Sequence, residues 1–372
     1  MRVDPVDRSS RIVALDILRG IALFGMILVH FHQRMEKPAS GTEDLIGWFV
    51  WMFAETKAWA TFAFLFGAGF AILIRRAEAR GLRVVPLYLR RMAALAVFGI
   101  LVQVLFGFTI LIDYAIWGVA LLLIRKLPTP VLLVIALCSA AAGTVASKVS
   151  PVDRQQYVAH FKALHDAENS GTFQQAMTVR AAHARWWYLR PRVLVPDSDL
   201  VLFIFGLLAI RHGIFEDARK KKRVILAMMT FGLVSWSAAW FMYFKFPDAD
   251  YGAFGILSDQ WLAFTYVGGV ILLLAYRPVW KQRLAPFGIA GRMALTNYVL
   301  QAAILSVLAC GYGFELKIRP YYDIPATILL FGVCVALSTM WLARFAYGPL
   351  ERIWRWVTYA EWNATLNKEV IA

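Results

Sequence analysis

The amino-acid sequence predicts an all-α fold, a polytopic membrane helical bundle of about ten transmembrane helices. Three observations carry this prediction. The chain is 60% hydrophobic and only 17% charged, and its mean hydropathy is +0.59. Long apolar runs recur along the whole length, and the basic residues collect between them. Soluble domains have about a quarter of their residues charged, so this composition excludes an ordinary soluble enzyme and is typical of a multi-pass membrane protein.

Ten apolar runs define the expected spans. They cover residues 12–31, 59–74, 92–108, 110–124, 130–147, 198–211, 224–244, 259–276, 289–310 and 324–344. A straight helix needs about 20 residues to cross the hydrocarbon core. The shorter runs therefore predict tilted or broken spans, or bounds that slip by a few residues. The turn between the third and fourth runs is expected near Gly107 and Asp113. Residues 1–372 are expected to form a single integral membrane domain.

The distribution of Lys and Arg predicts how the chain is oriented. Basic residues are enriched in the cytoplasmic loops of membrane proteins, and alternate connections of this chain hold most of them. Both termini are then cytoplasmic, and residues 148–197 form a long extracytoplasmic loop. The net charge of +15 is explained by this orientation and by attraction to the anionic headgroups of the lipid bilayer. We therefore expect no nucleic acid as a partner.

The first span carries three polar side chains that are unusual inside an apolar run: Asp16, Arg19 and His30. At 100° per residue, Arg19 and His30 point in nearly the same direction, about 16 Å apart along the helix axis. Asp16 is the neighbour of Arg19 at i+3. Charged groups in a bilayer are costly and are functional candidates by default. A purely structural interpretation remains open, in which Asp16 neutralises Arg19 and His30 reaches the interface.

A basic connection follows the second expected span and contains Arg75, Arg76, Arg90 and Arg91. Positive-inside topology is one explanation for this cluster. The functional alternative is a cytoplasmic mouth for a polyphosphate such as coenzyme A. The run FAFLFGAGF (residues 62–70) has small residues that predict either close helix packing or room for a pantetheine-like chain.

No metal site is expected from the sequence. The three cysteines lie far apart inside apolar runs, and no Cys/His spacing typical of a metal site occurs. In the long outer loop, His160 and Asp166 miss the spacing of a soluble HxxxxD acyltransferase motif by one residue.

Five segments, in order along nearly the whole chain, resemble the YeiB-like family of bacterial inner-membrane proteins. They are LDILRGIALFGMILVH (15–30), FAFLFGAGFAI (62–72), YLRRMAAL (88–95), GRMALTNYVLQ (291–301) and YGPLERIWRWVTY (347–359). The resemblance implies a bundle of ten or more helices in a bacterial inner (cytoplasmic) membrane. Most members of that family have no assigned activity.

A narrower resemblance connects the first span to membrane acyltransferases of type 3. Those proteins carry an Arg or Lys, ten residues and then a His, as Arg19 and His30 do here. The resemblance implies a catalytic His, and it implies that Arg90 and Arg91 are associated with the acyl-CoA donor. YeiB-like proteins are grouped with these enzymes and with the lysosomal heparan-glucosaminide acetyltransferase. The chain departs from the YeiB-like family at one point. Members usually have a His and then a Gly-Asp pair in the third and fourth spans, whereas this chain has Gln103 and Thr109, with the acid only at Asp113.

The resulting hypothesis is an acyl-CoA-dependent O- or N-acyltransferase with His30 as general base. Arg19 would hold the donor or the thioester oxyanion, and Asp16 would hold Arg19. Acyl-CoA, with acetyl-CoA as the expected co-substrate, would enter from the cytoplasmic side. The acceptor hydroxyl or amine, presented from the outer side, would belong to a sugar, a lipid-linked glycan or a small metabolite. Two alternatives stay open: a carrier of a small metabolite, and a non-catalytic membrane partner subunit. An oligomer is compatible with the sequence.

Overall fold

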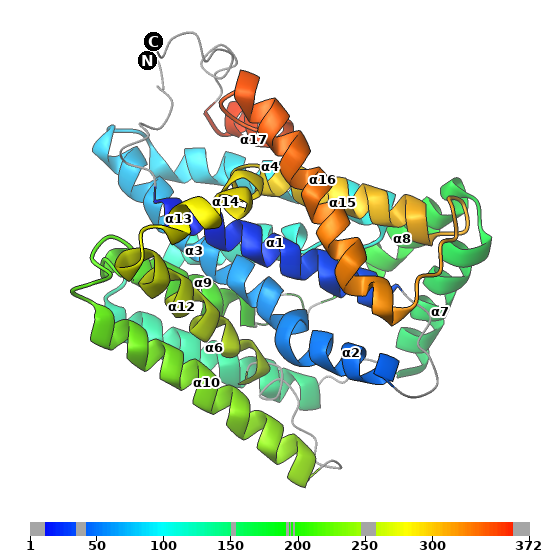
Figure 1. Cartoon of the computed structure of the whole chain (residues 1–372), viewed down its shortest axis with the longest axis horizontal. Helices are drawn as coiled ribbons and strands as arrows, with labels where there is room; N and C mark the ends of the chain where they lie inside the picture. The colour runs from blue at the N-terminus through cyan, green and yellow to red at the C-terminus, as the bar shows by residue number, and fades with distance from the viewer. Residues whose placement is uncertain are drawn as a thin grey trace.

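Every regular element of the described chain is a helix (Figure 1). The computed structural model describes residues 12–34, 42–149, 154–190, 193, 195, 198–246 and 258–359. The predicted all-α membrane fold is therefore confirmed. In order, the longer elements are α1 (Val13–Gln33), α2 (Thr42–Val50), α3 (Thr56–Ala79), α4 (Val84–Phe106), α5 (Leu111–Ile124), α6 (Thr129–Val149), α7 (Arg154–Ser170), α8 (Phe173–Tyr188), α9 (Ser198–Arg211), α10 (Lys222–Lys245), α12 (Leu262–Tyr276), α14 (Ala285–Arg292), α15 (Ala294–Ala309), α16 (Asp323–Arg344) and α17 (Pro349–Tyr359).

Each of the ten expected spans coincides with a helix or a helix pair, but not all ten are long enough to cross a bilayer unaided. Within the described ranges, six helical segments have the length and apolar composition of a span. A seventh arises if α14 and α15, which are bent by 86° at their junction, count as one broken span. α5 and the apolar part of α6 are shorter. A count of ten spans is thus not confirmed, although the multi-pass character is clear.

α1 lies at the centre of the bundle, between α3, α14, α15 and α16 (Figure 1). Its close approach to α14 depends on a glycine on each helix. A Cβ added to Gly20 would overlap the backbone of Phe287, and one added to Gly291 would overlap the Asp16 carbonyl oxygen. Small residues that allow backbones to approach are the usual basis of helix packing in membranes. Most of α1 is buried as a result.

A buried ion pair joins α3 to the segment before α12. The Lys57 side chain is 0% exposed, and its Nζ donates to Asp259 Oδ1 at 2.5 Å and to the Trp51 carbonyl oxygen at 3.2 Å. Thr56 Oγ1 and Trp240 Nε1 also donate to the Asp259 carboxylate. Trp51 begins a π-helical turn (Trp51–Glu55) that links α2 directly to α3. The aromatic stretch after the first span therefore continues into the second as helix.

α7 and α8 form a helical hairpin at one end of the bundle, on the right in Figure 1. A fully buried arginine, Arg180, ties this hairpin to the rest of the molecule. It donates to Glu168 at 2.7 Å, to the Leu105 carbonyl oxygen at 2.7 Å and to the Tyr312 hydroxyl at 2.9 Å. The contact with Leu105 satisfies a carbonyl in the last turn of α4, which ends at Gly107 with φ of 92°. The expected turn at Gly107 is confirmed.

The Lys57–Asp259 pair predicts an asymmetry between single and double substitutions. Lys57→Met leaves a partly buried carboxylate without its cation, which should lower the free energy of unfolding by about 3–5 kcal/mol. Chemical denaturation in mixed micelles measures this change. The double variant Lys57→Met/Asp259→Leu should recover most of the loss, because removal of both charges also removes their desolvation cost. A double variant as unstable as the single one would contradict this account.

Candidate functional site

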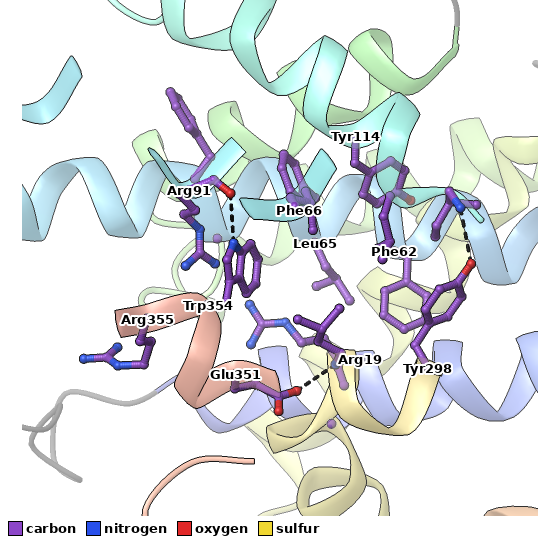
Figure 2. A pocket seen from close by; sticks show the side chains of 18 of the residues that line it. Arg19, Phe62, Leu65, Phe66, Arg91, Tyr114, Tyr298, Glu351, Trp354 and Arg355 are labelled. Carbon is purple, nitrogen blue, oxygen red and sulfur yellow. Dashed lines mark hydrogen bonds between the residues drawn. The ribbon is translucent and has the colours of Figure 1, made fainter. Parts of the chain in front are cut away.

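A pocket of about 270 Å³ lies at the meeting point of α1, α3, α4, α5, α14, α15 and α17 (Figure 2). Arginines and one glutamate line one part of it, and aromatic and aliphatic side chains line the other. The lining residues are Arg19, Phe62, Leu65, Phe66, Gly69, Phe70, Tyr88, Arg91, Leu95, Ile110, Leu111, Tyr114, Gly291, Arg292, Ala294, Leu295, Tyr298, Tyr347, Glu351, Trp354 and Arg355. Four arginines against one glutamate give this lining a net positive charge.

The arginines of the pocket are held in place by ring contacts and an ion pair. The Arg91 guanidinium carbon lies 3.4 Å from the centre of the Trp354 ring, a cation–π contact. Trp354 Nε1 in turn donates to the Arg91 carbonyl oxygen at 2.9 Å. Arg355 lies over the Tyr347 ring at 4.3 Å. Arg19 Nη1 donates to Asp16 at 3.1 Å. These side chains are therefore oriented before any ligand binds.

Glu351 holds the start of α15 at the wall of the pocket. Its Oε1 accepts from the backbone N–H groups of Leu295 at 2.7 Å and Thr296 at 3.0 Å, and Oε2 accepts from Thr296 Oγ1 at 2.5 Å. The first N–H groups of a helix lack partners within that helix and carry partial positive charge. The carboxylate from α17 therefore caps α15 where it bends away from α14 (Figure 2).

The far part of the pocket is aromatic. Phe66 and Tyr114 pack with ring centres 5.2 Å apart, and Phe62 and Tyr298 lie on the same side of the pocket in Figure 2. The Tyr298 hydroxyl accepts from the Ile110 backbone N–H at 3.2 Å. Ile110 follows the turn at Gly107, so this wall lies towards the α7–α8 hairpin and the arginines lie towards α17.

Of the residues predicted from the first span, only Arg19 lines the pocket. Asp16 is buried and bonded to Arg19, as the i+3 spacing predicts. His30 lies outside the pocket lining, and its ring packs against Phe108 with centres 4.2 Å apart. Phe108 is two residues from Ile110, so His30 is next to the far wall. The structure thus places an ion pair at one end and the imidazole beyond the other.

Of the four arginines in the predicted basic cluster, some line the pocket and others do not. Arg91 lines the pocket, whereas Arg90, its neighbour in sequence, is exposed. Arg75 is exposed and bonds to Glu216 at 3.0 Å, and Arg76 is half-buried outside the lining. Of the two glycines in FAFLFGAGF, Gly67 packs against the backbone of Phe203, while Gly69 lines the pocket. Close helix packing is therefore confirmed at Gly67, whereas room for a pantetheine-like chain beside Gly69 stays a prediction.

Several pocket residues were not singled out as site residues by the sequence reasoning. They are Arg292, Tyr298, Glu351, Trp354 and Arg355. All five fall within segments 291–301 and 347–359, which carry the family resemblance. The sequence did contain a signal for these residues. Each of the five segments that resemble the YeiB-like family contributes to the pocket lining, and only Ile110, Leu111 and Tyr114 come from outside those segments. Reading those segments as one site, instead of as markers of a family, would have found them.

Two protein families match the chain in separate parts. Residues 11–174 match the family described as heparan-alpha-glucosaminide N-acetyltransferase, catalytic. Residues 209–361 match the family described as protein of unknown function (DUF418). The first match contains α1, α3 and α4, and the second contains α15 and α17, so the pocket is built from both.

Three curated bacterial proteins are similar along nearly their whole length. YxaH of Bacillus subtilis (strain 168) is 27% identical over 406 residues, with 98% of both chains covered. A 39.9 kDa protein of Bacillus acidopullulyticus, from the amylase 3' region, is 28% identical with 96% of both covered. YeiB of Escherichia coli (strain K12) is 24% identical, over 96% of this chain and 99% of its own. All three are named as uncharacterized. Their similarity to this chain supports its resemblance to YeiB-like proteins.

Glu351 predicts a pH dependence of stability. Burial raises the pKa of Glu351, and hydrogen bonds from Thr296 and Leu295 oppose this shift only in part. A carboxyl group with a raised pKa in the folded state stabilises that state while protonated, and loses this contribution as pH rises through the raised pKa. From the ordinary value of 4.5 upwards, wild type should therefore lose more stability with rising pH than Glu351→Gln. Thermal unfolding midpoints across this range measure the difference.

The exposed Glu78 provides the matched control for this measurement. Glu78→Gln should follow the pH profile of the wild type. If Glu351→Gln does so as well, the pKa of Glu351 is not raised in the folded state.

Proposed function

We propose that the protein is a membrane acyltransferase that takes an acyl group, most simply acetyl, from acyl-CoA. The observation that carries the proposal is the pocket, with arginines at one end and aromatic walls at the other. Phosphate groups pair with guanidinium groups through charge-assisted hydrogen bonds, and an apolar channel suits an acyl-pantetheine arm. The family match over residues 11–174 to an N-acetyltransferase catalytic family supports the same chemistry.

The size of the pocket suggests which part of the donor would enter the pocket and which part would stay outside. Pockets for small ligands commonly measure about 300–1,000 Å³, so 270 Å³ accommodates an arm of coenzyme A and not the whole molecule. The acyl end would point towards Tyr298, and the phosphates would meet Arg19, Arg91 and Arg355. The nucleotide would remain outside the pocket, on the basic surface that includes Arg75.

His30 would serve as general base for the acceptor. It lies beyond the aromatic wall, on the side of the α7–α8 hairpin, so donor and acceptor would approach from opposite ends of the bundle. Arg19, held by Asp16, would bind the donor at its anionic part. Arg19 would therefore bind the donor and would not stabilise the thioester oxyanion, because Arg19 lies at the arginine end of the pocket.

The two ends of the pocket would face opposite sides of the membrane. The arginine end would face the cytoplasm of a bacterium, with both termini on that side of the inner membrane, and the α7–α8 hairpin would face outwards. An acceptor hydroxyl or amine of a sugar, a lipid-linked glycan or a small metabolite would then be modified on the outer side. The predicted extracytoplasmic loop, residues 148–197, contains this hairpin and would shape the choice of acceptor.

A carrier of a small metabolite is the second candidate, and the broken span favours it. Discontinuous helices whose N-termini point at anionic groups are typical of transporter binding sites, and the start of α15 faces a pocket rich in arginine. The two functions differ in the fate of the ligand, because a carrier releases it chemically unchanged.

The pocket predicts a difference between two adjacent arginines. Arg91→Ala should weaken binding of acetyl-CoA to the purified protein in nanodiscs by about 10- to 100-fold, since a charge-assisted contact contributes about 1.5–3 kcal/mol. Arg90→Ala is the matched control and should change the Kd by less than about threefold, as expected for an exposed charge. Isothermal titration calorimetry measures both. Equal effects of the two variants would place the phosphates on the surface and not in the pocket.

The general-base role of His30 predicts that its substitution slows acetyl transfer without weakening the binding of acetyl-CoA. His30→Ala should bind acetyl-CoA as the wild type does, yet transfer of radiolabelled acetyl to an acceptor should fall by about 10²- to 10⁴-fold. The assay uses a panel of amino sugars and sugar alcohols supplied on the outer side of oriented proteoliposomes. Label that crosses the membrane still attached to CoA, or as free acetate without modified acceptor, would support a carrier.

A further inference from the structure

Gln301 in α15 is a fully buried amide with no hydrogen-bond partner in the described part of the chain. Its side chain is 0% exposed, and neither Oε1 nor Nε2 is paired there. A buried polar group left unpaired costs about 1–3 kcal/mol, so such groups are rare and each requires an explanation. Asn297, one turn earlier, shows the ordinary case: its Nδ2 donates to the Ala290 carbonyl oxygen at 3.0 Å and to Ser338 Oγ at 2.9 Å.

The direction in which Gln301 points follows from its neighbours on the helix. Asn297 faces α16 through Ser338, and Tyr298 faces the pocket and the turn before α5 through Ile110. At 100° per residue, Gln301 lies about 40° from Asn297 and about 60° from Tyr298, hence between α16 and the pocket. α1 packs against both α15 and α16. Gln301 is therefore directed towards α1, one turn beyond the aromatic wall of the pocket.

α1 and α15 run side by side in the same direction. At one end, Gly291 in the last turn of α14 lies against the Asp16 carbonyl oxygen, which places the junction of α14 and α15 beside the first turn of α1. At the other end, Arg34 Nη1 contacts Cys310 Sγ at 3.4 Å. The second contact joins the C-terminal ends of the two helices, so the last turns of α1 and α15 lie level with each other.

This alignment places His30 about one turn of α15 beyond Gln301. Side chains lean towards the N-terminus of their own helix, so His30 leans back towards Gln301, and Gln301 leans towards the pocket. Nδ1 of His30 is also buried and has no hydrogen-bond partner among the described residues. Two side chains with unpaired polar atoms, Gln301 and His30, thus follow one another from the pocket wall towards the α7–α8 hairpin.

We propose that Gln301 is a catalytic residue of acyl transfer, whose Nε2–H group hydrogen-bonds the carbonyl oxygen of the acyl thioester. The proposal rests on the proposed function above. The acceptor oxygen or nitrogen attacks the thioester carbon and loses its proton to His30. As negative charge develops on the carbonyl oxygen, the Gln301 amide stabilises it, as amide donors do in oxyanion holes. The tetrahedral intermediate then collapses with cleavage of the C–S bond, and the thiolate of coenzyme A takes the proton from His30 and leaves as the thiol.

The test uses [1-¹³C]acetyl-CoA bound to the full-length protein in nanodiscs. A hydrogen bond to the carbonyl oxygen moves its ¹³C resonance downfield, so the signal should move upfield in Gln301→Leu relative to wild type. The Kd for acetyl-CoA should change less than about threefold, because the phosphates bind elsewhere. Gln301→Asn, which shortens the amide by one methylene, should give an intermediate or fully upfield signal.

Stability distinguishes this role from a structural one. Gln301→Leu removes an unpaired buried amide and should leave the thermal midpoint unchanged or raise it. Asn297→Leu, the matched control, breaks two hydrogen bonds and should lower the midpoint. The proposal is overturned if Gln301→Leu destabilises as much as Asn297→Leu, or if it binds acetyl-CoA with the wild-type ¹³C signal. No saturable binding by the wild type would instead overturn the proposed function, and this inference with it.

Discussion

The backbone N–H groups at the start of α15 set the constraint on which the site depends. A helix that begins inside a membrane protein exposes donors that water cannot satisfy, and each unpaired group is costly. Here the donors of Leu295 and Thr296 are satisfied by the Glu351 carboxylate, which comes from a different helix. The same contact positions α17, and α17 brings Trp354 and Arg355 to the pocket. The bend in the span, the C-terminal helix and the arginine end of the pocket are therefore one structural unit.

Two buried charged side chains elsewhere in the bundle connect parts of the chain that are far apart in sequence. Lys57 joins the second span to Asp259 across about two hundred residues of sequence. Arg180 joins the α7–α8 hairpin to the end of α4. The Asp16–Arg19 pair differs, because both groups are in α1 and the guanidinium reaches the pocket.

The sequence predicted the fold class and the apolar helices, because apolar runs and their basic flanks are determined locally by the bilayer, but the predicted count of ten spans is not confirmed. It also predicted the Asp16–Arg19 contact, which depends only on helical spacing. It did not separate Arg90 from Arg91, since both belong to one basic run and only the rotation of α4 against α17 turns one inwards. Nor did it find Glu351 or Gln301, whose roles depend on packing between helices far apart in the chain. The roles proposed for His30 and the pocket arginines remain predictions.

The C-terminal position of α17 has a consequence for biosynthesis. A ribosome releases α1 and α3 into the membrane long before it makes Glu351, so the start of α15 stays uncapped and the pocket open until α17 has been made. Chains that terminate early would retain most of their spans, and would insert, yet would lack part of the pocket wall. The docking of one short amphipathic helix thus completes the pocket only after most of the spans are already in the membrane.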